Sequence, residues 1–165
     1  KARECHDECH RITLLALGES GIELAENMIC IGHVEFRSGD YPQALEWYDG
    51  AIRLIKNNTG GHEVSMVKVL QRKGLAHDKL GDYDKAIESF GEVLKLGRKI
   101  WSRDDLELSN VLNSLGNAHR NRMEFTRALR CYEESLRIRH KAGEDLSVAN
   151  TKNNIGAVLV ALEQS

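Results

Sequence analysis

Four segments of this chain repeat one pattern at a nearly fixed interval. Each segment contains a glycine, and these glycines are Gly32, Gly74, Gly116 and Gly156. By subtraction of those positions, the first two intervals are 42 residues and the last is 40. A period of this length predicts stacked helical repeats, in which each unit packs on its neighbours instead of around one central core. Because such arrays mostly hold other molecules, the period also predicts a binding function.

The copies carry the same chemistry at the same distance from the glycine. Alanine lies twelve residues after it and an aromatic residue sixteen after it, at Ala44 and Tyr48, Ala86 and Phe90, and Ala128 and Tyr132. Gly-Asp-Tyr precedes the alanine in two copies, and Met123-Glu124-Phe125 replaces it in the third. Glycine there supplies a left-handed residue and aspartate an N-cap. The unit is therefore predicted to be an antiparallel helix pair, and its repeat glycine lets the two helices approach closely.

The pattern predicts helices at about 2–17, 22–38, 41–57, 64–80, 83–100, 106–121, 124–141 and from about 147. They form a single array over residues 1–165. Residues 2–17 would be the second helix of a partial repeat, 22–57, 64–100 and 106–141 the repeats, and 147–165 the first helix of a truncated repeat. Since the sequence starts at Lys1 without methionine and stops in a helical segment, we expect a piece of a longer protein.

The overall composition argues against several classes of partner. The net charge is −2, with 29% charged residues of both signs, which gives no electrostatic reason for binding nucleic acid or an anionic membrane. No apolar run of roughly 18 residues occurs. Four cysteines lack the density of a disulfide framework and favour reduced thiols, which predicts a cytoplasmic location.

Residues with catalytic or metal-binding chemistry have simpler explanations in the repeat. No Gly-rich phosphate loop, nucleophile elbow or paired carboxylates are present, so we expect no enzyme and no cofactor. His77 and His119 occupy equivalent positions, which favours packing. The run Cys5-His6-Asp7-Glu8-Cys9-His10 is compatible with zinc, but Cys5 and Cys9 coincide with buried repeat positions, so no metal site is predicted. Trp47 and Trp101 are expected to pack, and an outer-surface contact is the alternative for Trp101.

These motifs resemble the tetratricopeptide repeat over nearly the whole chain. The long period, together with LRIRHKAGEDLSVANTKNNIG from Leu136, is similar to the kinesin light chain branch and related adaptors. The late proline of the family is replaced here by Lys56, Arg98 and His140. The resemblance implies an all-α fold, a right-handed superhelix of antiparallel helix pairs, whose concave groove is lined by the first helix of each pair.

The register of the family assigns groove-facing positions to the first helices. They are Glu26, Ile29, His33, Arg37, Lys68, Gln71, Leu75, Lys79, Asn110, Asn113, Asn117, Asn121, Asn150 and Asn153, with Arg120 beside them. Asparagine is a mediocre helix former, yet four of them recur on one face of 106–121. A side-chain amide both donates and accepts hydrogen bonds, so we expect this row to bind the backbone of an extended peptide. Simple solvation of an exposed face is the alternative.

The predicted function is a protein-interaction module or adaptor scaffold that holds an extended peptide or a partner helix. Lys68, Lys79 and Arg120 would select acidic side chains, and Ile29 and Leu75 an aromatic one. The clamp for chaperone tails is not assembled, because Gln71 and Leu75 stand at its positions. The alternative is a structural role, since apolar Val158, Leu159, Val160 and Leu162 favour stacking or self-association. An enzyme or nucleic-acid binder is the least favoured reading.

Overall fold

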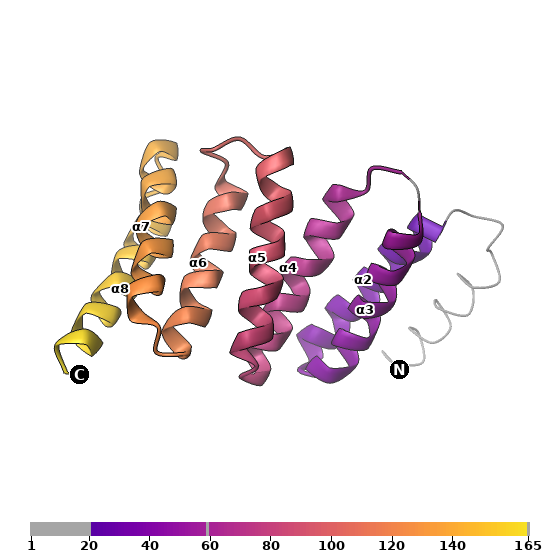
Figure 1. Cartoon of the computed structure of the whole chain (residues 1–165), viewed down its shortest axis with the longest axis horizontal. Helices are drawn as coiled ribbons and strands as arrows, with labels where there is room; N and C mark the ends of the chain where they lie inside the picture. Colours follow the sequence, from indigo (N-terminus) through magenta and orange to yellow (C-terminus); the bar gives the residue numbers. More distant parts are fainter. Residues whose placement is uncertain (1–20, 59, 165) are drawn as a thin grey trace. The chain divides into compact units, whose positions relative to one another are not determined.

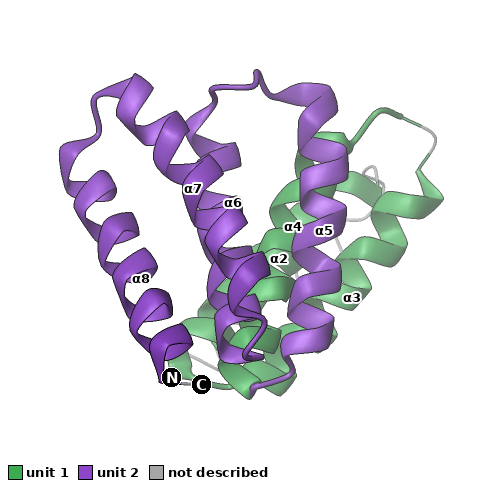
Figure 2. Ribbon diagram, turned by 60° about the vertical axis from the view of Figure 1, so that its left-hand side comes forward, with its two compact units in different colours: residues 1–80 green, residues 81–165 purple. Residues whose placement is uncertain are grey.

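The structure is a computed structural model, and it describes residues 21–58 and 60–164. Seven helices and their connecting turns account for these residues, which contain no strand (Figure 1). The all-α class is therefore confirmed, whereas the predicted helix 2–17 lies outside the described residues. The chain divides into two compact units, residues 1–80 and 81–165 (Figure 2), and the division falls inside the predicted repeat 64–100.

The first unit contains α2 (Gly21–Ser38), α3 (Tyr41–Asn57) and α4 (Glu63–Leu80). The turn between α2 and α3 has the predicted chemistry. Gly39 has φ +90°, which a residue with a side chain rarely adopts. Asp40 Oδ1 accepts a hydrogen bond from the Gln43 amide at 3.1 Å, and Pro42 lies in the first turn of α3, where its missing N–H costs little.

The core of this unit depends on the approach of α3 to α2. Tyr48 and Ala44 are fully buried on the inner stripe of α3. The Tyr48 ring lies on Gly32, where an added Cβ would be 2.7 Å from ring carbon Cε1. The predicted role of the repeat glycine is confirmed at this helix pair, because any side chain there would push the ring away.

The second unit contains α5 (Tyr83–Ile100), α6 (Leu106–Asn121), α7 (Phe125–Ala142) and α8 (Asp145–Glu163). Gly81 precedes α5 with φ +80°, as the turn requires. Asp82 occupies the predicted N-cap position of α5, but its side chain makes no cap hydrogen bond. The Asp82 carboxylate instead accepts from Lys85 Nζ at 3.4 Å, an ion pair within the first turn.

The same glycine–aromatic contact joins α6 to α7. An added Cβ at Gly116 would lie 2.6 Å from Tyr132 Cε1, and Tyr132 is fully buried. Tyr132 and Ala128 also pack with Val158 of α8. Gly156 on α8 differs, because nothing in the described residues lies within 4 Å of a Cβ built there.

In the third copy, the turn between α6 and α7 contains no glycine. Met123 has φ +62°, a left-handed conformation that is costly for a side chain, and it is 77% exposed. The following Glu124 occupies the N-cap position without a side-chain cap bond. Its carboxylate accepts from His119 Nδ1 at 2.6 Å, which fastens the end of α6 to the start of α7.

Helix bounds agree with the sequence expectation to within two residues at each end for the helices that begin after residue 20. The largest difference is at α8, which begins at Asp145 instead of 147. Among the residues described, no helix is both long enough and apolar enough to cross a membrane.

We predict opposite effects of alanine at two repeat glycines. Gly116→Ala forces its methyl group into the Tyr132 ring and lowers the free energy of unfolding by about 1–3 kcal/mol. Gly156→Ala is the matched control, and it raises that free energy by about 0.5–1 kcal/mol because helical glycine is entropically costly. Urea unfolding followed by circular dichroism measures both. Equal effects of the two substitutions would contradict the glycine–aromatic account.

Candidate peptide-binding face

The asparagine row of α6 is tied into the second unit through its amide oxygens. Asn117 Oδ1 accepts from the Tyr132 hydroxyl at 2.7 Å. Asn113 Oδ1 accepts from Asn154 Nδ2 of α8 at 3.2 Å, and Asn110 Oδ1 accepts from Arg139 at 3.0 Å. The row is therefore neither a simple solvated face nor a set of unengaged amides. The oxygens of these three asparagines each accept a hydrogen bond inside the second unit.

Because these oxygens are held by hydrogen bonds, the direction of the Nδ2 group of each amide is also fixed. An amide whose oxygen is held turns its Nδ2 group to the opposite side. The structure gives the Nδ2 groups of Asn110, Asn113 and Asn117 no acceptor among the described residues. Their side chains are half-buried at Asn113 and Asn117 and exposed at Asn110. The face thus presents oriented donors rather than amides that can both donate and accept.

Arg139 of α7 is the group that holds Asn110. Its side chain is buried, with 7% exposed, and its Nε donates to Ser109 Oγ at 2.8 Å. Its Nη1 donates to Ser147 O at 3.0 Å and to Thr151 Oγ1 at 2.7 Å, both on α8. All four acceptors, Asn110 included, are uncharged. Burial lowers the pKa of this guanidinium, and the charge of Glu144 opposes that shift.

Sequence reasoning missed this network, although the repeat contained a signal for it. At the position of Arg139, the other two copies carry Ile55 and Gly97. At the position of buried Ser109, they carry Ala25 and Val67. Ser135 Oγ also bonds Ser109 O at 2.9 Å. Polar residues at positions that are apolar elsewhere in a repeat indicate partners for one another, because a buried polar group needs a hydrogen bond.

In the first unit, two predicted groove residues bind each other. Glu26 of α2 accepts from Lys68 Nζ at 3.4 Å and from Ser65 Oγ at 2.5 Å, both on α4. The hydrogen bond from Ser65, and then the charge of Lys68, hold the pKa of this carboxyl below its usual range against partial desolvation. Lys68 is thus partly neutralised, which weakens its predicted role in selecting an acidic ligand.

The remaining predicted residues differ in their access to solvent. Ile29 is 1% exposed and packs in the core, so we omit it from the proposed contact set. The exposed members are Arg37, Lys79, Asn121, Asn150 and Asn153, and the half-buried members are His33, Gln71, Leu75 and Arg120. Burial lowers the pKa of His33, and the charges of Arg72 and Arg37 act in the same direction.

The histidines and cysteines show packing environments. His77 and His119 are 6% and 7% exposed, which confirms the packing role predicted for them. Burial raises the pKa of the Cys131 thiol to about 11, which disfavours a reactive thiolate. The described residues hold no group of three His, Cys, Asp or Glu side chains that could bind a metal. Cys5 to His10 lie outside them.

The fold and this face define a scaffold of paired helices whose polar surfaces are built on repeated positions. The chain belongs to the tetratricopeptide repeat family, whose models match residues 23–99 and residues 108–142. This confirms the family predicted from the motifs. The family fold is generally a non-enzymatic scaffold for protein interaction.

Solved structures share the fold at low sequence identity. BtubC (BKLC) from P. vanneervenii is 20% identical with a TM-score of 0.75, and the match covers 97% of this chain and 63% of that one. The apo form of RapI is 16% identical with a TM-score of 0.81, covering 95% of this chain and 43% of that one. The N-terminal domain of stress-induced protein-1 (STI-1) from C. elegans is 15% identical, with a TM-score of 0.64, covering 82% of this chain and 98% of that one.

The chain therefore spans less than two thirds of the length of the first two structures that it resembles. The search of the curated proteins gave no match.

We predict that Asn110→Asp stabilises the protein by about 1 kcal/mol at pH 7, because Arg139 gains a charged acceptor. The guanidinium lowers the folded-state pKa of the new carboxyl below its unfolded value of about 3.9. The gain is therefore present above about pH 4 and is lost as pH falls through the folded-state pKa. Urea unfolding at neutral and acid pH measures it.

Asn113→Asp is the matched control, since its oxygen accepts from an uncharged amide and gains no cation. A gain at pH 7 for Asn113→Asp as large as that for Asn110→Asp would contradict the role of Arg139.

Proposed function

We propose that this chain binds an extended peptide through the Nδ2 donors of Asn110, Asn113 and Asn117. The carrying observation is that all three amide oxygens are held by partners within the second unit. Oriented donors bind backbone carbonyl oxygens with little loss of side-chain freedom, and this preorganisation favours affinity. Backbone carbonyls occur in every peptide, so the row supplies affinity that is independent of ligand sequence.

Selectivity then comes from charged and apolar side chains of each unit. Arg120 on α6 is half-buried and would pair with an acidic side chain of the peptide. The first unit, taken by itself, has exposed Lys79 and half-buried Leu75, which would contact an acidic side chain and an apolar or aromatic one. The proposed ligand is an acidic segment with an aromatic residue, and the proposed role is a cytoplasmic adaptor scaffold.

The test removes the Nδ2 donors of the asparagine row and keeps the Oδ1 acceptors that bond within the protein. Peptides are selected on the wild-type protein from a random displayed library, and their affinities are measured by calorimetry. Asn110→Asp with Asn113→Asp keeps both Oδ1 atoms for Arg139 and Asn154 but replaces both Nδ2 donors with oxygens. We expect affinity to fall about tenfold or more, because the new oxygens repel the carbonyls.

A matched control carries the same two charge changes at exposed positions elsewhere, Asn27→Asp with Asn57→Asp. We expect the control to bind the selected peptides within about twofold of wild type. Failure of the library to yield binders, or equal affinities for the two double variants, would overturn the proposal. Alanine at Asn117 is a poor test, since it removes an acceptor of the buried Tyr132 hydroxyl and so also destabilises the fold.

A second candidate is a structural role in which α8 packs on another helix. No aromatic ring of the described residues packs on Gly156, whereas tyrosine rings pack on Gly32 and Gly116. Leu159 and Val160, in the same helix, are 47% and 53% exposed. If α8 mediates self-association, light scattering should show oligomers that grow with concentration and disappear in Leu159→Asp. A monomer at all concentrations would contradict self-association.

A further inference from the structure

The second unit also has a charged hollow, which is lined by α7 and the connection from α5 to α6. One cavity of about 660 Å³ is lined by Arg103, Asp104, Arg130, Glu133, Glu134, Arg137 and Lys141. An adjoining cavity of about 450 Å³ shares Arg103, Glu134 and Arg137 with it and adds Arg98, Trp101, Ser102 and Leu108. Together they form one depression, here called the outer hollow, which uses none of the asparagine donors.

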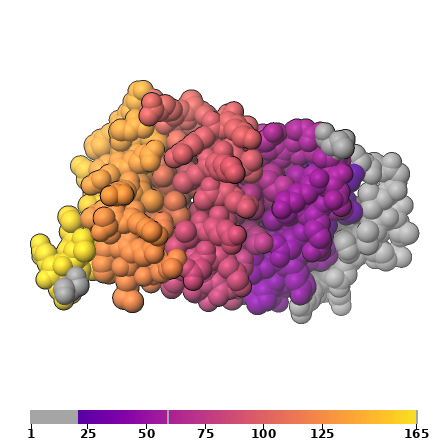
Figure 3. Space-filling view, viewed as in Figure 1, coloured from indigo at the N-terminus to yellow at the C-terminus, as the bar shows by residue number. Residues whose placement is uncertain are grey.

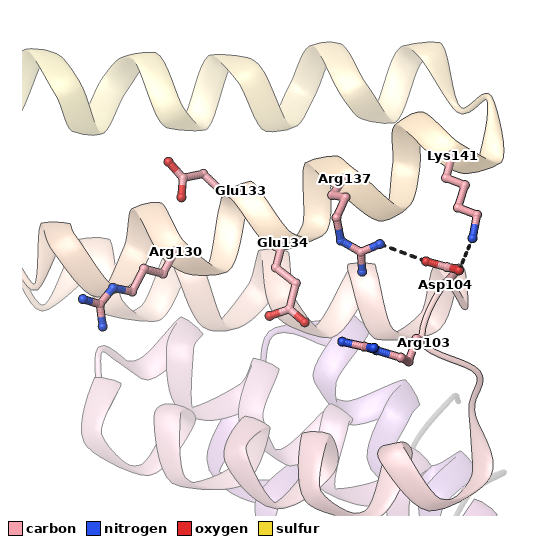
Figure 4. A pocket seen from close by; sticks show the side chains of 7 residues that line it. All are labelled: Arg103, Asp104, Arg130, Glu133, Glu134, Arg137 and Lys141. Atoms are coloured by element: carbon pink, nitrogen blue, oxygen red, sulfur yellow. Dashed lines mark hydrogen bonds and ion pairs between the residues drawn. The ribbon is translucent and has the colours of Figure 1, made fainter.

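The connection that forms its edge is held firmly. Asp104 accepts from Arg137 at 3.0 Å and from Lys141, both on α7 (Figure 4). The Asp105 carboxylate caps α6 by accepting from the Glu107 amide at 2.9 Å. The Trp101 ring lies so close to Gly97 that an added Cβ there would overlap the ring. The edge is therefore formed before any ligand binds.

The charges in the outer hollow favour an anion. Five cations line it, namely Arg98, Arg103, Arg130, Arg137 and Lys141, against three carboxylates, Asp104, Glu133 and Glu134. Hydrogen bonds from Lys141 and then Arg137 hold the pKa of Asp104 below its usual range, so one carboxylate balances two cations. Arg98 and Arg103 are exposed and form no ion pair with the described residues. The excess is two positive charges on one surface of a chain whose net charge is −2.

Two apolar side chains contribute to the lining of the smaller cavity. They are Leu108, which is 6% exposed, and the half-buried Trp101. Figure 4 shows Arg103 and Glu134 extending toward one another across the hollow, so Glu134 occupies part of the space in front of that guanidinium. Figure 3 shows the surface in the view of Figure 1, where atoms coloured as residues near 100 adjoin atoms coloured as α7. Arginines that share a cavity with an indole ring suit carboxylates that flank an apolar side chain.

We propose that the outer hollow binds an acidic peptide segment of a partner protein, with carboxylates on Arg98 and Arg103 and an apolar side chain against Trp101. Glu134 competes with the carboxylates of the peptide for Arg103, so it lowers the affinity of the outer hollow for the peptide. The site is separate from the asparagine face, and the array would then engage partners on two surfaces. Charge complementarity commits the occupant to an acidic peptide.

The test uses a fluorescent synthetic peptide of Asp and Glu with one central Leu, and anisotropy as the readout at low and physiological salt. We expect Arg98→Glu with Arg103→Glu to weaken binding about tenfold or more. We expect Glu134→Gln to strengthen it about threefold, because the competing carboxylate is removed. Replacing the central Leu by Gly should weaken binding and abolish a change in Trp101 fluorescence, measured in a Trp47→Phe background.

Matched controls make the same charge changes outside the hollow. Arg53→Glu with Lys56→Glu on α3 repeats the double reversal, and Glu92→Gln on α5 repeats the neutralisation, all at exposed positions. We expect both controls to bind as the wild type does. The proposal is overturned if the double reversal binds like its control, or if the peptide binds no better than its Lys counterpart. Asn110→Asp with Asn113→Asp should leave this binding unchanged, so the result is independent of the asparagine face.

Discussion

The contact between a repeat glycine and an aromatic ring positions the features on which the proposed function depends. At Gly116 the missing side chain lets the Tyr132 ring lie directly on α6. That placement brings the tyrosine hydroxyl to the next residue along, Asn117, whose oxygen accepts from it at 2.7 Å. A fully buried ring thereby orients an amide at the surface. The packing of Tyr132 on Gly116 therefore both joins α6 to α7 and orients the Asn117 amide on the polar face of α6.

Arg139 extends this arrangement to α8. Its guanidinium links Ser109 and Asn110 of α6 to Ser147 and Thr151 of α8 without any carboxylate acceptor. A buried cation with neutral partners is costly unless its donors are satisfied, so its geometry is demanding. Breaking one partner leaves the charge poorly solvated. Such a group supports a unique arrangement of α6, α7 and α8 and holds Asn110 in place.

The repeat alone predicted the helices, the turns and the glycine–aromatic packing, because these features follow from spacing and local propensity. It correctly assigned His77 and His119 to packing. The register of the family, in contrast, placed Ile29 in the groove, whereas the structure buries Ile29 in the core. A register gives the direction of a side chain but not its neighbours. The bonds of the asparagine oxygens depend on Arg139, Tyr132 and Asn154, which come from other helices. Side-chain pairs of this kind require the tertiary structure.

The central claim is that buried packing orients the donors that bind a peptide, and Tyr132→Phe tests it most directly. This substitution keeps the ring on Gly116 and removes only the hydroxyl that holds Asn117. Phenylalanine is already present at the same position of another copy, at Phe90. The measurement is the affinity for library-selected peptides, with Tyr48→Phe as the control, since the Tyr48 hydroxyl orients no asparagine of the row. The account predicts about a threefold or greater loss for Tyr132→Phe and none for the control. Equal affinities for the wild type and both variants would contradict it.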